Sequence, residues 1–318
     1  MIDFIGDIHG HADKLEELLQ KLGYSKPNNF YVHSNPNRTV LFVGDYIDRG
    51  PKIRETLEIV KSMVDNGSAI ALMGNHEYNA LCFHYQETDG GHLRKHLIKN
   101  IVQHYKTLKQ FQNRQVEYEA YLEWFKTLPL FYETKEFRAV HACWDEKTID
   151  FLKTKLVNNR LTDDLIIESV KKGTELNEAI EQTLKGKEIE LPQGLSFDDK
   201  DGTNRNEIRI KWWEDPAEMT YRAISVEPLE NLPETKIDLS LLKSKDFYNE
   251  EQKPVFFGHY WLKGKPLLKR ENICCLDYSV AKEGYLVAYS FDGEHHLTDS
   301  NLTFVSNSKK DLAFSRKV

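Results

Sequence analysis

The chain has 318 residues, 40% of them hydrophobic, which is enough for one large globular domain or two smaller ones. Its formal net charge of −7 provides no general attraction for nucleic acid, so we expect no nucleic-acid partner. No stretch approaches the roughly 18 apolar residues of a membrane span. Met1 directly precedes the first predicted strand, which leaves no room for a signal peptide, so we expect a cytoplasmic protein without a membrane partner.

The first third of the chain alternates apolar runs with helical patterns. Residues 2–5, 40–43 and 69–73 are apolar runs that predict buried strands. Between them, leucines at helical spacing end at Gly23, and a second helix begins at Pro51 and ends before Gly67. This order predicts a βαβαβ unit and therefore a mostly parallel sheet.

The middle of the chain predicts two insertions. Residues 78–133 are helical and aromatic, and we expect a helical cap there. Between His92 and Val116 lie six Lys or Arg residues and no acid, namely Arg94, Lys95, Lys99, Lys106, Lys109 and Arg114. These cations either collect an anionic substrate or form a solvated helix face. Residues 145–250 are polar and predict helices and loops, with an exposed loop at 193–206.

Short strands return towards the end of the chain. They are predicted at residues 266–268, 273–276 and 285–291, with a turn at Asp292 and Gly293, and we expect them in a second sheet packed on the first. Residues 306–318 predict a frayed tail. The expected fold is therefore an α/β sandwich of two packed mixed sheets flanked by helices, with one domain over residues 1–305.

Four short strings carry the chemistry, and each follows or ends an apolar run. They are GDIHG at 6–10, GDYIDRG at 44–50, GNHE at 74–77 and GHY at 258–260. Asp7 and His9 are two residues apart, so in an extended segment they point to the same side. The carboxylate of Asp45 has two oxygens and can bridge two cations. Strand ends thus deliver several ligands to one edge of a sheet.

The donor set predicts two metal ions. Three further side chains, Asn75, His141 and His259, also follow apolar runs. Oxygen and nitrogen donors without a thiolate suit divalent Mn, Fe, Zn, Co or Ni, and together they are too many for one tetrahedral ion. Two metals roughly 3.5–4 Å apart can clamp an in-line displacement at phosphorus, and a metal-bound water with a pKa of roughly 7 supplies hydroxide. The implied reaction is hydrolysis of a phosphoester.

These strings resemble those of the calcineurin-like metallophosphoesterase superfamily, most closely its phosphoprotein-phosphatase branch of bacterial type. The resemblance implies a binuclear centre, with manganese as the leading metal. Asp7 and His9 would bind the first ion, Asp45 would bridge, and Asn75, His141 and His259 would hold the second. It also implies that His76 is the general acid oriented by Asp48, and that Arg49, with Asn75, binds the substrate phosphate.

Two segments depart from the family pattern. Where that branch has HGG, this chain has His141, Ala142 and Cys143, so the loop carries side chains. A second phosphate-binding arginine normally follows a tryptophan and an Asp-Pro pair. Arg222 stands in that position with a shorter gap, and is a candidate on that ground.

Several residues have alternative interpretations. Asp48 could pair only with Arg49, and Trp212 or Trp213 could stack a nucleobase or lie in the core. His104 and the histidines near it are not spaced like the motif ligands, so core or surface roles are expected. The four cysteines, Cys82, Cys143, Cys274 and Cys275, lack CxxC spacing and predict buried thiols.

Three functions remain open from the sequence. The first is a phosphomonoesterase acting on phosphorylated Ser, Thr or Tyr in proteins or on a small phosphoester. The second is a hydrolase of nucleotide polyphosphates such as diadenosine tetraphosphate, whose extra phosphates the basic cap would bind. The third is a protein that binds a phosphorylated partner without turnover, which the complete ligand set disfavours.

Overall fold

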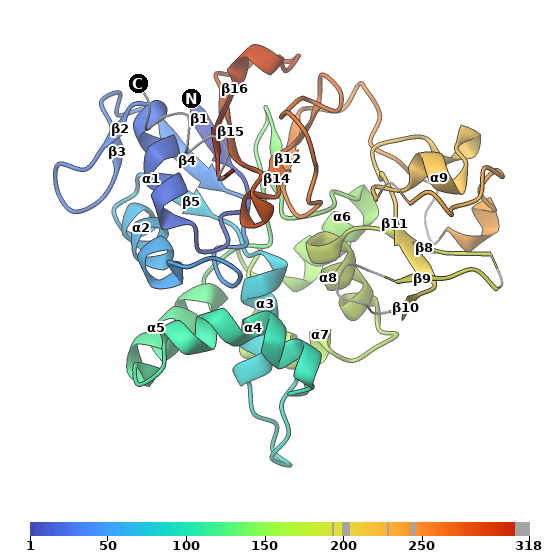
Figure 1. The fold of residues 1–318 in the computed structure, drawn as a ribbon, viewed down its shortest axis with the longest axis horizontal. Coiled ribbons are helices and arrows are strands. Elements are labelled where there is room, and N and C mark those ends of the chain that lie inside the picture. Colours follow the sequence, from blue (N-terminus) through green and yellow to red (C-terminus); the bar gives the residue numbers. More distant parts are fainter. Residues whose placement is uncertain (193, 199–203, 228, 243–245, 309–318) are drawn as a thin grey trace.

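A computed structural model describes residues 1–308 except 193, 199–203, 228 and 243–245. Two mixed β-sheets lie against each other, and helices cover their outer sides (Figure 1). Each sheet contributes strand ends to one common edge, where the motif residues gather. The predicted α/β sandwich of two packed mixed sheets with helices is confirmed.

The first sheet has the strand order β14-β15-β1-β4-β5, with β16 added beside β15. Its strands are β1 (Ile2–Ile5), β4 (Thr39–Phe42), β5 (Ala69–Ala71), β14 (Asp277–Tyr278), β15 (Tyr285–Phe291) and β16 (Leu302–Ser306). β1, β4 and β5 run parallel, as the βαβαβ pattern predicts, and β15 pairs antiparallel with β1. The carboxyl ends of the three parallel strands therefore meet at one edge.

The second sheet has the order β13-β12-β7-β6. Its strands are β6 (Phe131–Glu133), β7 (Arg138–Val140), β12 (Val255–Phe257) and β13 (Ile273–Cys275). β12 lies parallel to both β7 and β13, so the ends of β7 and β12 also point the same way. All nine residues of β7, β12 and β13 are buried, and all of them except Arg138 are apolar.

Aromatic side chains fill the space between the sheets. Phe4 of β1 stacks on Phe256 of β12 with ring centroids 3.7 Å apart, and Phe137 packs edge-on against Phe4. Tyr289 of β15 contacts Phe256 from the same side of the first sheet. The relative position of the two strand-end sets is thus fixed by an apolar layer.

Replacing Phe256 with alanine is expected to lower the free energy of unfolding by about 3–5 kcal/mol, because it removes a fully buried ring and leaves a cavity. Phe256 is 0% exposed. Denaturant unfolding followed by circular dichroism would measure the loss. Phe247→Ala is the matched control, since that ring is 37% exposed, and a change within about 0.5 kcal/mol is expected there. Equal losses in both variants would contradict the proposed role of the interlayer core.

Two helices cover the outer face of the first sheet, at the left of Figure 1. They are α1 (Ala12–Lys21) and α2 (Ile53–Asp65). Leu15, Leu18 and Leu19 are the buried leucines of α1, and Gly23 follows its end with φ +90°, a conformation that favours glycine. A short hairpin of β2 (Tyr24–Ser25) and β3 (Val32–His33) follows.

The predicted helical insertion forms α3 (Asn75–His84), α4 (Ile98–Gln110) and α5 (Gln115–Lys126), below the first sheet in Figure 1. The basic residues between His92 and Val116 do not form one free patch. Arg94 is part-buried and donates to Asn79 and Gln103, and Lys106 donates to the carbonyl oxygen of Arg49. Collection of substrate by this cap stays a prediction.

The polar insertion forms helices and a separate outer lobe, at the right of Figure 1. Its elements are α6 (Glu146–Lys155), α7 (Asp163–Ser169), α8 (Glu175–Lys185), β8 (Glu188–Glu190), β9 (Phe197–Asp198), β10 (Asn204–Arg205), β11 (Glu207–Arg209) and α9 (Tyr221–Ile224). Ile189, Ile208 and Ile224 belong to a small apolar cluster that stabilises this lobe. The assignment of residues 1–305 to one domain stays a prediction.

Several predicted elements are wrong. Residues 266–268 form no strand, because the backbone N–H groups of Leu267 and Leu268 bind the side chains of Tyr278 and Asp299 instead of a neighbouring strand. β15 lies in the first sheet rather than the second, since its mostly buried residues pair antiparallel with β1. The expected loop at 193–206 contains paired β9 and β10 in its described part.

The predicted frayed tail begins too early. Ser306 ends β16, and the N–H of Asn307 donates to the carbonyl oxygen of Gly284, so these residues are held by the sheet. Residues 309–318 of the tail lie outside the described residues.

Other predictions about the core are confirmed. The four cysteines are free and buried. Trp212 and Trp213 are each 2% exposed and pack on Phe257, so the core interpretation holds for both.

Among the helices of the described residues, none combines the length and apolar character needed to cross a bilayer.

Candidate metal centre

Side chains from five strand ends converge at the common edge of the two sheets. Asp7 and His9 follow β1, Asp45 follows β4, Asn75 and His76 begin α3 after β5, His141 follows β7, and His259 follows β12. Each of these seven residues is buried, with at most 7% exposure. The structure therefore brings together all six predicted metal ligands and the predicted acid.

Asp45 lies between two groups of histidines. Its Oδ2 is 3.5 Å from His9 Nε2 and 3.9 Å from His76 Nε2, whereas its Oδ1 is 3.5 Å from His141 Nε2. Ligand atoms of His9, Asp45 and His76 lie within 4.8 Å of one another, and so do those of Asp45, His141 and His259. Asp45 is the member that both groups share, as a bridging ligand must be.

Asn75 completes the second group. Its Oδ1 lies 3.0 Å from His141 Nε2 and 2.8 Å from His259 Nδ1, so one amide oxygen faces two imidazole nitrogens. A cation held between these atoms would meet one oxygen and two nitrogens in addition to Asp45.

Backbone carbonyls fix which imidazole nitrogens face the site. His9 Nδ1 is 3.0 Å from the carbonyl oxygen of Ile47, and His141 Nδ1 is 2.8 Å from that of Val43. Because a carbonyl only accepts, both Nδ1 atoms carry a proton, and both Nε2 atoms are the ones that face the site. Metal-binding histidines are held in this way.

The donor set fits divalent cations. His9 Nε2 is buried and has no hydrogen-bond partner, and such an atom is costly unless something binds it. Burial lowers the pKa of His9 to about 3 against the opposing effect of Asp45, so the imidazole is neutral. Burial alone would raise the pKa of Asp45, but His141, His76 and His9 outweigh it, so the carboxylate is ionised. A neutral imidazole beside an ionised carboxylate is a suitable pair of metal ligands.

Asp7 lies behind the second group. Its carboxylate oxygens accept from the backbone N–H of His259 at 3.0 and 3.2 Å. A Cβ added to Gly258 would lie 1.9 Å from Asp7 Oδ1, so only glycine allows this approach. Asp7 thus fixes the backbone of His259, and its contact with the first metal stays a prediction.

Glu77, the last residue of GNHE, organises the loop after β4. Its carboxylate accepts from the backbone N–H groups of Asp45 at 2.9 Å, Tyr46 at 2.8 Å and Gly74 at 3.0 Å. Asp45 has φ +58°, in the left-handed region that side chains rarely adopt. Sequence reasoning missed this role, although a glutamate among apolar residues at the start of a predicted helix was an available signal.

His76, the predicted general acid, contacts Asp48, the residue predicted to orient it. His76 Nδ1 lies 2.5 Å from Asp48 Oδ2, and Asp48 Oδ1 lies 2.8 Å from Nδ1 of His104. Asp48 therefore pairs with two histidines, and the described residues show no ion pair between Asp48 and Arg49. Burial alone would lower the pKa of His76, but the carboxylates of Asp45 and Asp48 outweigh it and raise that pKa. The interaction of His104 with Asp48 was not foreseen.

Arg49 and Arg222 lie in different parts of the molecule. The Arg49 guanidinium lies 4.6 Å from the ring centroid of Trp261, three residues beyond Gly258, which keeps it beside the centre. Arg222, in α9, is held in the outer lobe by Glu234 and by the carbonyl oxygens of Leu232 and Glu230. The prediction for Arg222 is therefore wrong, because its guanidinium is already bound away from the metal candidates.

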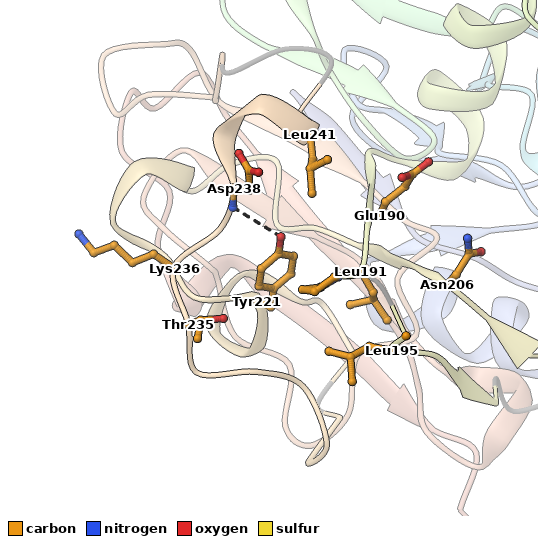
Figure 2. A pocket seen from close by; sticks show the side chains of 11 residues that line it. Glu190, Leu191, Leu195, Asn206, Tyr221, Thr235, Lys236, Asp238 and Leu241 are labelled. Carbon is orange, nitrogen blue, oxygen red and sulfur yellow. Dashed lines mark hydrogen bonds between the residues drawn. The ribbon is translucent and has the colours of Figure 1, made fainter.

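The outer lobe also has a pocket, lined by residues that include Leu191, Tyr221 and Leu241 (Figure 2). In it the backbone N–H of Asp238 faces the Tyr221 hydroxyl at 3.5 Å. None of the clustered ligands of the sheet edge lines this pocket.

Residues 1–259 match the profile of the calcineurin-like phosphoesterases. The chain belongs to the calcineurin-like phosphoesterase family. The matched range runs from the first strand to His259, so it includes every residue of the candidate centre.

Several relatives and solved structures are similar to this chain. The bis(5'-nucleosyl)-tetraphosphatase PrpE of Oceanobacillus iheyensis is 35% identical over 141 residues, 44% of this chain and 54% of the relative. That of Halalkalibacterium halodurans is 31% identical over 187 residues, 58% and 74% of the two chains. The chain thus spans about half the length of the first relative. A protein serine/threonine phosphatase from Saccharomyces cerevisiae has a TM-score of 0.47 and 14% identity, covering 96% of this chain and 79% of the other.

Within this calcineurin-like phosphoesterase, the loop that departs from HGG is packed into the core. Ala142, Cys143 and Trp144 are all buried, and the carbonyl oxygen of Ala142 accepts from Trp212 Nε1 at 3.0 Å. Burial raises the pKa of Cys143, so its thiol stays protonated. The side chains of this loop therefore stabilise the position of His141 rather than adding a nucleophile.

Proposed function

We propose that the chain hydrolyses phosphoesters with two divalent cations held on either side of Asp45. The observation that carries this proposal is that the two Asp45 carboxylate oxygens face separate histidine groups. His9 with Asp7 would hold one cation, and Asn75, His141 and His259 the other, with manganese the first metal to test. Bound there, the cations would supply Lewis acidity and activate water for in-line attack on phosphorus.

The side chains around this centre have distinct tasks. His76 carries a proton on Nδ1 against Asp48, and its Nε2 faces Asp45 Oδ2, where a leaving oxygen would need a proton. Arg49 can bind phosphate oxygens with its guanidinium. The φ of +59° at Arg49 places this residue in the same left-handed loop as Asp48.

The substrate class that best fits is a nucleotide polyphosphate, diadenosine tetraphosphate above all. The curated relatives are bis(5'-nucleosyl)-tetraphosphatases. In addition, two positively charged side chains are available to bind further phosphates. Lys282 Nζ is 5.0 Å and the Arg49 guanidinium 4.6 Å from the ring centroid of Trp261. The second candidate is a phosphomonoester, including a phosphorylated protein, and the combination of His76, Asp48 and Arg49 supports it.

A substrate panel tests these assignments. Purified chain loaded with Mn²⁺ would be assayed with diadenosine tetraphosphate, p-nitrophenyl phosphate and phosphorylated peptides. We expect the highest kcat/KM for diadenosine tetraphosphate. Preference for the monoesters would favour the second candidate, and no hydrolysis of any substrate with any divalent metal would contradict the proposed function. The assignment to the cytoplasm remains a prediction.

A further inference from the structure

The contact between His76 and Asp48 continues into the helical insertion. Asp48 Oδ1 accepts from His104 of α4, and His104 Nε2 lies 2.8 Å from the hydroxyl of Tyr118 in α5. The series His76, Asp48, His104 and Tyr118 is buried throughout, with no member more than 5% exposed. Buried polar groups linked in this way hold one another in a single arrangement.

Thr107, one turn after His104 on α4, binds Asp48 twice. Its hydroxyl donates to Asp48 Oδ1 at 2.5 Å and accepts from the Asp48 backbone N–H at 3.0 Å. Asp48 itself has φ +67°, a backbone conformation that is unfavourable for residues other than glycine. Contacts from α4 therefore hold both the backbone and the carboxylate of Asp48 in place.

The donors around Asp48 also fix the protonation pattern of the series. A carboxylate accepts only, so His76 and His104 both present Nδ1–H to it, and His104 Nε2 is hydrogen-bonded to the Tyr118 hydroxyl. With its Nδ1 occupied, His76 must direct Nε2 towards Asp45 and the cation positions. If His104 were lost, Asp48 would keep its bond from Thr107 but lose the second donor to Oδ1, so its carboxylate and the His76 ring would be held less firmly.

We propose that His104 is a positioning residue for the phosphoester reaction, acting through Asp48 on His76, with Tyr118 supporting it. The helical insertion would then be part of the proton-delivery apparatus as well as a cover for the site. This inference depends on the proposed function, because it assigns His76 the task of protonating the leaving oxygen.

The first test uses His104→Phe, which keeps a ring but removes both nitrogens, and His104→Asn, which restores a donor near the Nδ1 position. With an alkyl phosphate, whose leaving group needs a proton, we expect His104→Phe to lower kcat by about 10- to 100-fold, as loss of such an orienting partner does. With 2,4-dinitrophenyl phosphate, whose leaving group needs none, kcat should change by less than about threefold. His104→Asn should recover part of the loss.

A double variant separates positioning from packing. His76→Asn with His104→Phe should be no slower than His76→Asn alone, because His104 acts only through His76. His84→Phe is the control for ring packing, since the His84 ring packs against those of His104 at 5.6 Å and Tyr118 at 5.0 Å, and it should leave the hydrolysis of both substrates unaffected. Equal losses with both leaving groups, or a further loss in the double variant, would overturn the proposal.

A readout without substrate keeps this test separate from that of the proposed function. In ¹H–¹⁵N spectra recorded at a pH above the pKa of His76, where its ring is neutral, wild-type His76 should show the proton on Nδ1, and His104→Phe should show a mixture of tautomers. If His76 keeps the Nδ1 proton in the variant, the positioning role is wrong even where activity falls. If the spectra change as expected but no phosphoester is hydrolysed, the proposed function fails while the structural relation stands.

Discussion

Replacing Asp45 with asparagine is expected to remove both metal ions and lower kcat/KM by about three powers of ten or more, since the Lewis-acid contribution is worth several kcal/mol. In the variant the side chain between the two histidine groups has no negative charge, and an amide nitrogen replaces one of its two ligand oxygens. Metal content by elemental analysis and steady-state hydrolysis of the preferred substrate would measure the two losses.

Asp13→Asn is the control for this variant. The side chain of Asp13 is 63% exposed, and its ion pair with Lys52 lies at the surface. It should retain metal and activity. An Asp45→Asn protein that binds two equivalents of metal would contradict the bridging role.

Replacing His76 with asparagine is expected to leave metal content unchanged and to lower kcat with an alkyl phosphate by about 10²–10⁴-fold, the usual contribution of a general acid. The loss should be much smaller for an aryl phosphate with a good leaving group. Rates for both substrate types, measured beside metal analysis of the same preparations, would show the difference.

The exposed His295 provides the control, because His295→Asn should affect neither rate nor metal content. Unchanged hydrolysis of the alkyl phosphate by His76→Asn would exclude His76 as the acid. Loss of metal in this variant would instead make His76 a ligand, a role that its place in the group with His9 and Asp45 allows.

The sequence predicted which side chains gather at the sheet edge where one local rule determines the position of a side chain. Each predicted ligand follows an apolar run, and buried strands that end at one edge bring such residues together whatever lies between them. Asp7 and His259 are far apart in the chain, yet they are in contact. Asp7 follows β1, which is parallel to β4, and His259 follows β12, which is parallel to β7, and these strands end at the common edge.

The sequence was less informative where tertiary contacts determine the position of a strand or a side chain. β15 is a mostly apolar run that suits either sheet, and only its pairing with β1 places it in the first. Arg222 follows a family-like Asp-Pro pair, but the outer lobe binds its guanidinium. His104 has no motif spacing because α4 brings it to Asp48 from 56 residues away. Local patterns carry no information about such contacts.

The most direct test of the account is anomalous scattering from a crystal soaked in Mn²⁺. The account predicts two manganese peaks on either side of the Asp45 carboxylate, one beside His9 and one beside Asn75, His141 and His259. A well-ordered crystal with no peak between these side chains, or with a single peak away from Asp45, would contradict it.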